Sequence, residues 1–147
     1  MNRASRRKKV LTPTIFEVRS AFLLIDQMFD DLRTGQLEFA SIEGGPEYAV
    51  FRDKHDDRLP IVPALDGWIN CWERLGKDMH FSIDQQPLRV LMQVLDIPDA
   101  YLTSEQIAAA SAVVENQRRM YRTLDVYKVR STAVTEQTAI LLEKATA

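Results

Sequence analysis

The sequence predicts an all-α or α-dominated fold: a bundle of four to five helices with a small, irregular β-like insertion near residues 36–62. Apolar residues recur at helical spacing near both ends of the chain, which is typical of amphipathic helices. All five glycines and four of the six prolines lie between Gly35 and Pro87. With 147 residues, 46% of them apolar, the chain has the size and composition of one ordinary domain. We therefore expect a flexible basic arm over residues 1–11 and a single helical domain over residues 12–147.

The first helix is predicted to begin at Thr12-Pro13 or at Thr14 and to end at Gly35. Thr14 and Glu17 have the spacing of a capping box, and a glycine after the last helical turn favours a left-handed C-cap. One stripe of this helix is apolar and is expected to face the core. The stripe consists of Ile15, Val18, Phe22, Ile25, Phe29 and Leu32, widened by Phe16, Leu24 and Met28.

The insertion is predicted from alternating apolar residues and turn signals. Leu37 and Phe39, then Tyr48 and Val50, then residues 59–62 alternate as in short strands or an irregular hairpin. Turn signals such as Gly44-Gly45-Pro46 separate them. Because such excursions often carry binding residues, the insertion is of functional interest.

Two shorter helices follow. Pro63 is predicted to open a helix that runs to Leu75 and is closed by Gly76. A second helix is predicted from about Asp84 to Leu95, started by Ser82 or Asp84 and stopped by Ile97-Pro98.

The last segment is predicted to be helical from Thr103, which caps it together with Gln106. No glycine or proline occurs from Asp99 to the C-terminus, so one long helix is compatible with the pattern. The favoured break is Arg130-Ser131-Thr132, where Ser131 or Thr132 would cap a final helix ending near Lys144. We expect this segment to pack against the long first helix.

Positive charge is unevenly distributed along the chain. The first nine residues carry five positive charges and no negative ones, which leaves 14 basic against 21 acidic side chains and a net charge of −7 on the rest. Basic arms bind nucleic acid by neutralising phosphates, and they also serve as solvated ends. The basic residues of the arm are Arg3, Arg6, Arg7, Lys8 and Lys9.

A second cationic group is predicted on the helix around residues 113–130. When residues are placed around the helix axis at about 100° per residue, one side of the helix is apolar and the opposite side is cationic. The cationic side is either a solvated face paired with carboxylates such as Glu115 and Asp125, or a surface that binds phosphates or carboxylates of a partner. The apolar arc holds Val113, Gln117, Met120, Leu124 and Tyr127, and the cationic arc holds Arg118, Arg119, Arg122 and Arg130.

Trp68 and Trp72 are four residues apart and are either core residues or interface anchors. Cys71 is the only cysteine; this excludes an intrachain disulfide and suits a reducing cytoplasm.

No site for a metal, a cofactor or a membrane span is predicted. The polar run that holds Asp53, His55, Asp56 and Asp57 is typical of an exposed turn rather than a metal site. No apolar stretch is long enough for a membrane span. We expect no catalytic residues, no metal and no cofactor.

Three stretches resemble short, uncharacterised proteins of proteobacteria and of their prophages or mobile elements. They are residues 1–9 (MNRASRRKK), residues 63–68 (PALDGW) and residues 117–121 (QRRMY). The resemblance implies a bacterial or phage setting and assigns no site. The resulting expectation is a non-enzymatic accessory or regulatory protein that binds a protein partner. The alternative is sequence-independent nucleic-acid binding through the arm and the Arg118, Arg119 and Arg122 face.

Overall fold

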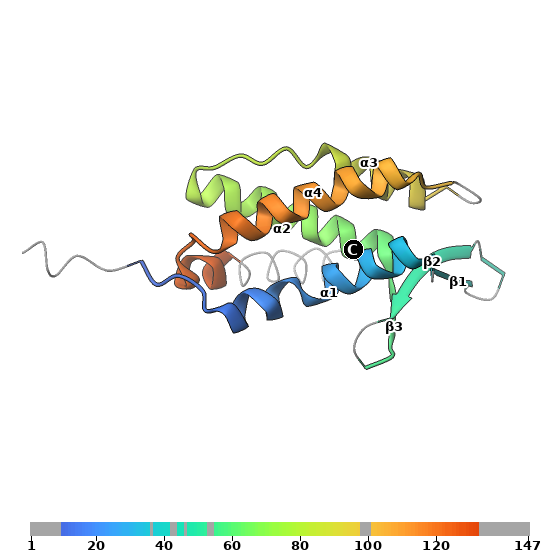
Figure 1. Ribbon diagram of the computed structural model, residues 1–147, viewed down its shortest axis with the longest axis horizontal. Coiled ribbons are helices and arrows are strands. Elements are labelled where there is room, and N and C mark those ends of the chain that lie inside the picture. Colours follow the sequence, from blue (N-terminus) through green and yellow to red (C-terminus); the bar gives the residue numbers. More distant parts are fainter. Residues whose placement is uncertain are drawn as a thin grey trace, which may run out of the picture.

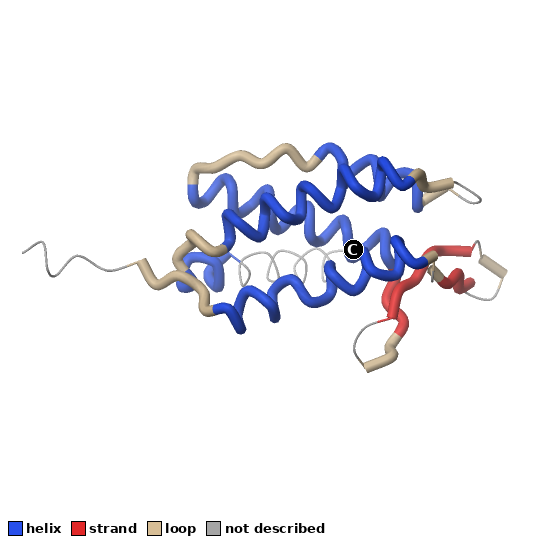
Figure 2. The backbone as a smooth tube through the Cα atoms, viewed as in Figure 1, coloured by secondary structure: helices blue, strands red, loops and turns tan. Residues whose placement is uncertain are grey.

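The computed structural model describes residues 10–35, 37–41, 44–45, 47–52, 55–97 and 101–132. The helices lie lengthwise beside one another, and a small sheet covers one end of the bundle (Figures 1 and 2). The predicted α-dominated fold with a β insertion is confirmed. The helices are α1 (Ile15–Thr34), α2 (Ile61–Met79), α3 (Gln86–Leu95) and α4 (Ser104–Tyr121), and a further helical segment covers residues 126–132. The strands are β1 (Glu38–Ser41), β2 (Glu47–Arg52) and β3 (Arg58–Pro60).

Helix α1 begins and ends as predicted. The amide of Glu17 donates to Thr14 Oγ1 at 3.1 Å and the amide of Thr14 donates to Glu17 Oε1 at 3.3 Å, which completes the capping box. Gly35 ends the helix with φ of 69°, a conformation that a side chain disfavours. The residues of α1 that are buried are Val18, Phe22, Ile25, Met28, Phe29 and Leu32.

Three residues assigned to the core stripe of α1 are exposed, and for them the prediction is wrong. Ile15 is 76% exposed, Phe16 77% and Leu24 49%. The predicted stripe covers more than half of the helix circumference, whereas α1 packs against α4 on one side and β2 near its end. Apolar side chains that point away from these neighbours therefore remain uncovered by the described residues.

The insertion is a three-stranded antiparallel sheet in the order β1-β2-β3. Glu38 faces Val50 in the first pair, and Phe51 faces Leu59 in the second. The buried residues of β2 pack on α1 and α2, so the sheet joins the two helices at this end of the bundle. Of the predicted strand over residues 59–62, Leu59 and Pro60 belong to β3, whereas Ile61 already begins α2.

Ion pairs on the sheet surface link β1 to β2 and β3. Arg52 bridges Glu38 at 2.7 Å and Asp56 at 2.8 Å, and Arg58 reaches Glu38 at 3.2 Å. The hydrogen bond from Arg52 lowers the pKa of Glu38. Because these groups are solvated, each pair adds little to stability.

Helix α2 is longer than predicted at both ends. It begins at Ile61 rather than Pro63, and it passes through Gly76 to end at His80, which is left-handed with φ of 59°. The reason lies in the turn that follows. The amide of Phe81 donates to the carbonyl of Gly76 at 3.0 Å, and a Cβ at residue 76 would lie 2.6 Å from the Phe81 carbonyl oxygen. Gly76 thus permits a close approach inside the helix instead of ending it.

Two glycine-to-alanine substitutions in α2 are expected to have opposite effects on stability. Gly76→Ala should lower the free energy of unfolding because of the clash with Phe81. Gly67→Ala should raise it by about 0.5–1 kcal/mol, because a Cβ there meets nothing within 4 Å and alanine favours the helix. Urea unfolding of both variants measures the difference, and equal stabilisation by both would contradict the close approach.

Helices α3 and α4 follow the predictions closely at their starts. The amide of Gln86 donates to Asp84 Oδ1 at 2.9 Å at the beginning of α3, two residues after the predicted start. For α4, the predicted capping box is confirmed: the amide of Gln106 donates to Thr103 Oγ1 at 3.1 Å, and that of Thr103 to Gln106 Oε1 at 3.0 Å.

The break in the last segment lies at residues 122–125, so its prediction at residues 130–132 is wrong. Thr123 Oγ1 donates to the Met120 carbonyl at 2.7 Å, and Asp125 Oδ1 accepts from the amide of Tyr127 at 3.0 Å and so caps the next helical segment. Ser131 and Thr132 are helical. The final helix predicted to end near Lys144 lies otherwise outside the described residues.

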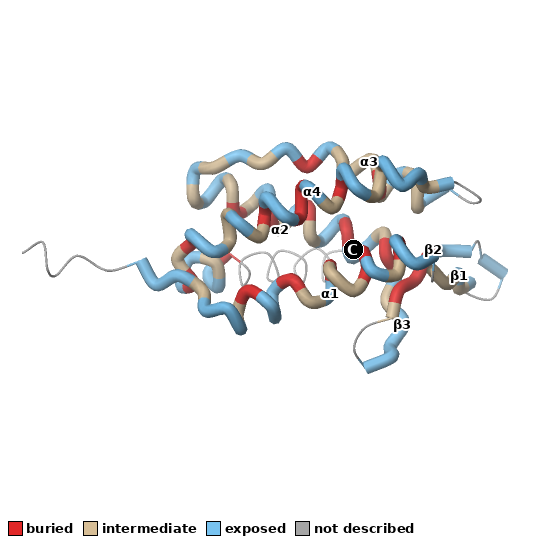
Figure 3. Tube along the Cα trace, in the orientation of Figure 1, coloured by how far each residue is buried: buried red, intermediate tan, exposed pale blue. Residues whose placement is uncertain are grey.

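The buried side chains form one cluster contributed by all four helices and β2, along the inward faces of the bundle (Figure 3). The predicted packing of the first helix on the last segment is confirmed for α1 and α4.

A chain of hydrogen-bonded polar side chains crosses this hydrophobic cluster. The indole Nε1 of Trp68 donates to Gln117 at 2.7 Å, Gln117 donates to Gln85 at 2.8 Å, and Gln85 donates to the Ile69 carbonyl at 3.0 Å.

Candidate functional site

An apolar groove of about 550 Å³ lies between α1 and α2 and is partly open to solvent. The α1 wall is formed by Ser20, Ala21, Leu24, Ile25 and Met28, and the α2 wall by Pro63, Ala64, Gly67, Trp68 and Cys71. Phe51, Leu59 and Pro60 close the end beside the sheet. No Asp, Glu, His, Lys or Arg is among these described lining residues.

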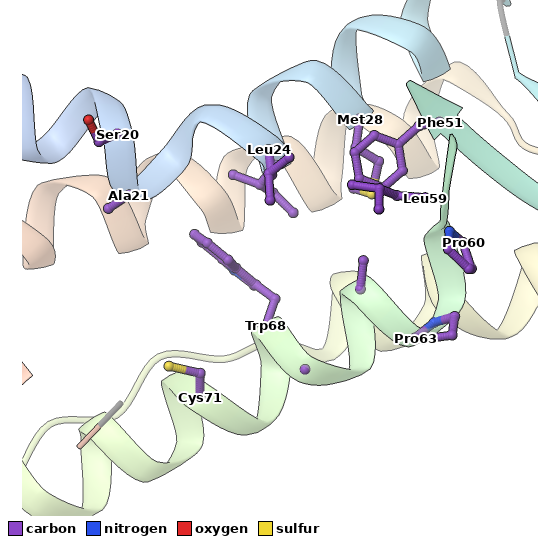
Figure 4. A pocket seen from close by; sticks show the side chains of 13 residues that line it. Ser20, Ala21, Leu24, Met28, Phe51, Leu59, Pro60, Pro63, Trp68 and Cys71 are labelled. Carbon is purple, nitrogen blue, oxygen red and sulfur yellow. The ribbon is translucent and has the colours of Figure 1, made fainter. Parts of the chain in front are cut away.

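The groove follows from the way in which the helices pair. Helix α1 packs on α4, α4 on α3, and α3 on α2, so α1 and α2 are the two ends of this series. They meet at the bottom of the groove, where the rings of Phe22 and Trp68 form an edge contact with centroids 5.1 Å apart. Figure 4 shows the indole of Trp68 reaching from α2 toward α1, with Phe51 and Leu59 near Met28 at the sheet end.

Small residues leave space in the walls. Ala21 on α1 and Ala64 and Gly67 on α2 are all exposed. Leu24 is exposed beside them, and Phe16 continues the same row two turns earlier on α1. Apolar surface therefore extends along α1 beyond the groove itself.

The helical segment of residues 126–132 lies at the end of the groove that is opposite the sheet. Arg130 Nη2 lies 3.7 Å from Glu17 Oε2 in the first turn of α1. Thr132 is buried, and its hydroxyl donates to Asp78 Oδ2 near the end of α2 at 2.9 Å. The segment thus contacts both helices.

The prediction that Arg118 lies on a solvated face is wrong, but its predicted pairing with Glu115 is present. Its side chain is only 15% exposed and lies between α4 and α1, with Nη2 2.5 Å from Asp26 Oδ1 and 3.4 Å from Glu115 Oε1. The guanidinium also lies over the Phe22 ring at 4.6 Å. Burial tends to lower the pKa of Arg118, but hydrogen bonding and the charge of Asp26 raise it above its ordinary value. The ion pair joins α1 to α4.

The other predicted arginines are exposed, but they do not form one stripe with Arg118. Arg119 donates to Asn116 Oδ1 at 3.3 Å, and Arg122 follows the last turn of α4. Arg130 belongs to the next helical segment, beyond the break, and pairs with Glu17. Arg119, in the last turn of α4, and Arg122, at its C-cap, are therefore the two exposed members of the predicted arc that lie together at the end of this helix. The predicted arm residues Arg3, Arg6, Arg7, Lys8 and Lys9 lie outside the described residues.

The two tryptophans have different environments. Trp72 is buried and its ring lies 6.1 Å from that of Phe81, so it is a core residue and not an accessible anchor. Trp68 is half-buried and lines the groove, as does Cys71.

The sequence does not predict the α1 wall of the groove as a site. The sequence signal for this wall is the width of the apolar stripe of α1. The stripe is wider than the surface that one packing partner can cover, so Phe16 and Leu24 remain exposed.

The acidic turn after β2 does not gather metal ligands. His55, Asp56 and Asp57 are exposed, Asp56 is engaged with Arg52, and Asp53 lies outside the described residues. Among the described residues, no cluster of His, Cys, Asp or Glu side chains is placed to hold a metal ion. Nor does any described helix combine the length and apolar character that crossing a bilayer requires.

Comparisons of the chain with protein-family models, with curated proteins and with solved structures gave no match. The resemblance to short proteobacterial and prophage proteins therefore stays a prediction.

Proposed function

We propose that the protein is a non-enzymatic binding protein that accepts an amphipathic helix of a protein partner in the groove between α1 and α2. The observation that supports this proposal most directly is the groove: about 550 Å³ of apolar space with no Asp, Glu, His, Lys or Arg among its described lining residues. Burial of apolar surface favours binding, whereas acid–base chemistry needs titratable groups in the cleft.

The shape of the groove fits a helix. Its walls run from Ser20 to Met28 and from Pro63 to Cys71, eight residues apart in each helix, which corresponds to about 12 Å or two helical turns. A helix laid between two helices reproduces bundle packing, and recognition would use apolar residues spaced by three and four positions. Trp68 supplies the large aromatic surface that interface centres favour.

The proposed setting is the cytoplasm of a bacterium or the host cell of a phage, where an accessory or regulatory protein acts by docking. This part of the proposal is supported by the single cysteine and by the sequence resemblance given above.

A second candidate function is sequence-independent nucleic-acid binding through the arm and the end of α4. It is supported by Arg119 and Arg122, which are exposed close together and for which no ion pair within the described residues is found. The pairing of Arg118 with Asp26 argues against it, since one of the three arginines is already neutralised within the molecule.

Filling the groove tests the first proposal. Gly67→Trp places an indole in the groove from a position where a Cβ would meet no neighbour within 4 Å. The wild-type protein is used to capture a partner from the native host, the partner is identified and purified, and its Kd is measured by calorimetry. We expect Gly67→Trp to weaken binding at least about tenfold, or 1.4 kcal/mol.

The controls separate the two candidate functions. Gln93→Trp adds the same side chain to the exposed surface of α3 and should leave the Kd unchanged. Arg119→Glu combined with Arg122→Glu should also leave it unchanged. Normal binding by Gly67→Trp would refute the groove proposal, and nucleic-acid binding that is lost in the arginine variant and weakens steeply with salt would establish the second candidate.

A further inference from the structure

The end of the bundle opposite the sheet carries exposed apolar side chains that are not among the lining residues of the groove. The start of α1 and the helical segment of residues 126–132 lie together at this end (Figure 1). The amide of Val126 donates to the carbonyl of Leu11 at 2.8 Å, and Arg130 pairs with Glu17. Of the ten large apolar residues that are exposed in the described part of the chain, five lie here, and each is more than half exposed. They are Val10, Leu11, Ile15, Phe16 and Tyr127.

The most exposed of these side chains protrude as single groups. Ile15 and Phe16 belong to the first turn of α1, and about three quarters of each is in contact with solvent. Side chains that protrude in this way bury apolar area in a medium that surrounds each of them, as the boundary between headgroups and acyl chains of a bilayer does. A protein partner would instead need a complementary surface of about 800 Å². A bilayer surface therefore fits this end better than a folded partner does.

The same end is positively charged, whereas the middle of the chain is acidic. Residues 10–20 and 121–132 hold four basic and two acidic side chains, and residues 21–120 hold nine basic and seventeen acidic ones. Both acidic groups of this end are engaged, because Asp125 caps the helical segment and Glu17 pairs with Arg130. An anionic surface therefore attracts this end and repels the rest of the bundle. The basic residues of this end are all exposed, and they are Arg19, Arg122, Lys128 and Arg130.

We propose that this end of the bundle binds the surface of an anionic lipid bilayer. Ile15 and Phe16 insert at the level of the headgroups, and the exposed basic side chains contact the lipid phosphates. Binding of this kind needs no helix that spans the bilayer. A nucleic-acid strand would use the cations and the rings of Phe16 and Tyr127, but it would gain nothing from the aliphatic side chains beside them. The contact does not involve the groove and so goes beyond the proposed function.

Two double variants of the full chain test the insertion. Ile15→Ala with Phe16→Ala removes both protruding side chains of α1, and Leu24→Ala with Phe39→Ala removes a similar pair that is exposed elsewhere. Sedimentation with vesicles of phosphatidylglycerol and phosphatidylcholine measures the partition coefficient, and circular dichroism checks folding. We expect the first variant to bind at least about tenfold more weakly than the wild type and the second within about twofold of it, because only the first loses area buried in the bilayer. Both variants retain residues 1–9, so the charges there do not differ.

A tryptophan at residue 16 measures the insertion itself. With anionic vesicles, Phe16→Trp should show a fluorescence shift to shorter wavelength and quenching by brominated phospholipid. Phe39→Trp, at the sheet end, is the matched control and should show neither. The spectrum of the wild-type protein, recorded with the same vesicles, is subtracted to remove the signal of Trp68 and Trp72. Equal quenching of the two variants would contradict the orientation of the bundle on the bilayer.

Vesicle composition and salt test the charge. Vesicles of phosphatidylcholine alone should bind the wild type at least about tenfold more weakly than anionic ones, and high salt should weaken the binding to anionic vesicles. Absence of wild-type binding to anionic vesicles, or equal binding by the two double variants, would overturn the proposal.

Other occupants of this end give different results. A single-stranded oligonucleotide that binds the wild type but not Ile15→Ala with Phe16→Ala, without vesicle binding, would overturn the proposal in favour of nucleic acid. A dimer without lipid that the same variant loses would overturn it in favour of a second copy. Because Gly67→Trp leaves this end unchanged, it should retain vesicle binding, so failure of the groove proposal and failure of this one are distinguishable.

Discussion

Replacing Phe22 with alanine is expected to lower the free energy of unfolding by about 3–5 kcal/mol. The ring has no exposed surface and contacts three other aromatic rings, with centroids 5.1 Å from Trp68, 5.6 Å from Tyr121 and 6.3 Å from Trp72. It also lies beneath the guanidinium of Arg118. Alanine would leave a cavity where α1, α2 and α4 meet and would remove the cation–π contact.

The matched control lies on the same helix. Phe16 is also a phenylalanine of α1 and is 77% exposed. Phe16→Ala should change the free energy of unfolding by no more than about 0.5 kcal/mol. Urea unfolding followed by circular dichroism measures both variants. Comparable losses in the two would contradict the assignment of Phe22 to the core and Phe16 to the surface.

Replacing Gln117 with leucine is expected to cost about 2–4 kcal/mol, although the two side chains have similar volumes. Gln117 is fully buried, accepts from the Trp68 indole and donates to Gln85. Leucine would leave one donor and one acceptor in the interior without partners, and a buried polar group that loses its partner loses the free energy of its hydrogen bonds to water as well.

Asn116 provides the comparison for this variant. It precedes Gln117 on α4, is exposed and accepts a 3.3 Å hydrogen bond from Arg119. Asn116→Leu should change the free energy of unfolding by less than about 0.5 kcal/mol. Thermal or urea unfolding of both variants and of the wild-type protein measures these differences in the free energy of unfolding. A Gln117→Leu protein as stable as wild type would mean that the buried chain of polar groups contributes nothing net.

Local features of the fold could be predicted from the sequence, because they depend on residues close together. The capping boxes at Thr14 and Thr103 need only a hydroxyl and a side-chain carbonyl three positions later. Gly35 was correctly assigned as a C-cap on the same basis. Gly76 has the same appearance in the sequence, but its role depends on the path of the chain at Phe81, which composition does not show.

Other features were not predictable, for two different reasons. The break after α4 is local, since Thr123 Oγ1 donates to the Met120 carbonyl and Asp125 Oδ1 accepts from the Tyr127 amide, but no glycine or proline marks it. The remaining features depend on tertiary contacts. A helical wheel places Arg118 on a solvated face, because it does not reveal that Asp26, ninety-two residues away, lies opposite it. The groove likewise depends on which helices pair, and the amphipathic pattern of α1 indicates how much surface is apolar but not which part is covered.

The pairing of α1 with α4 affects how the chain emerges from the ribosome. Helix α1 ends at Thr34 and α4 begins at Ser104, seventy residues later. During synthesis, the part of α1 that α4 will cover, including Phe29, therefore stays uncovered on that side while the whole middle of the protein is translated. Domains expose such surface to aggregation and to chaperones until the missing element arrives. For this protein, the vulnerable interval of translation ends only when α4 has left the exit tunnel.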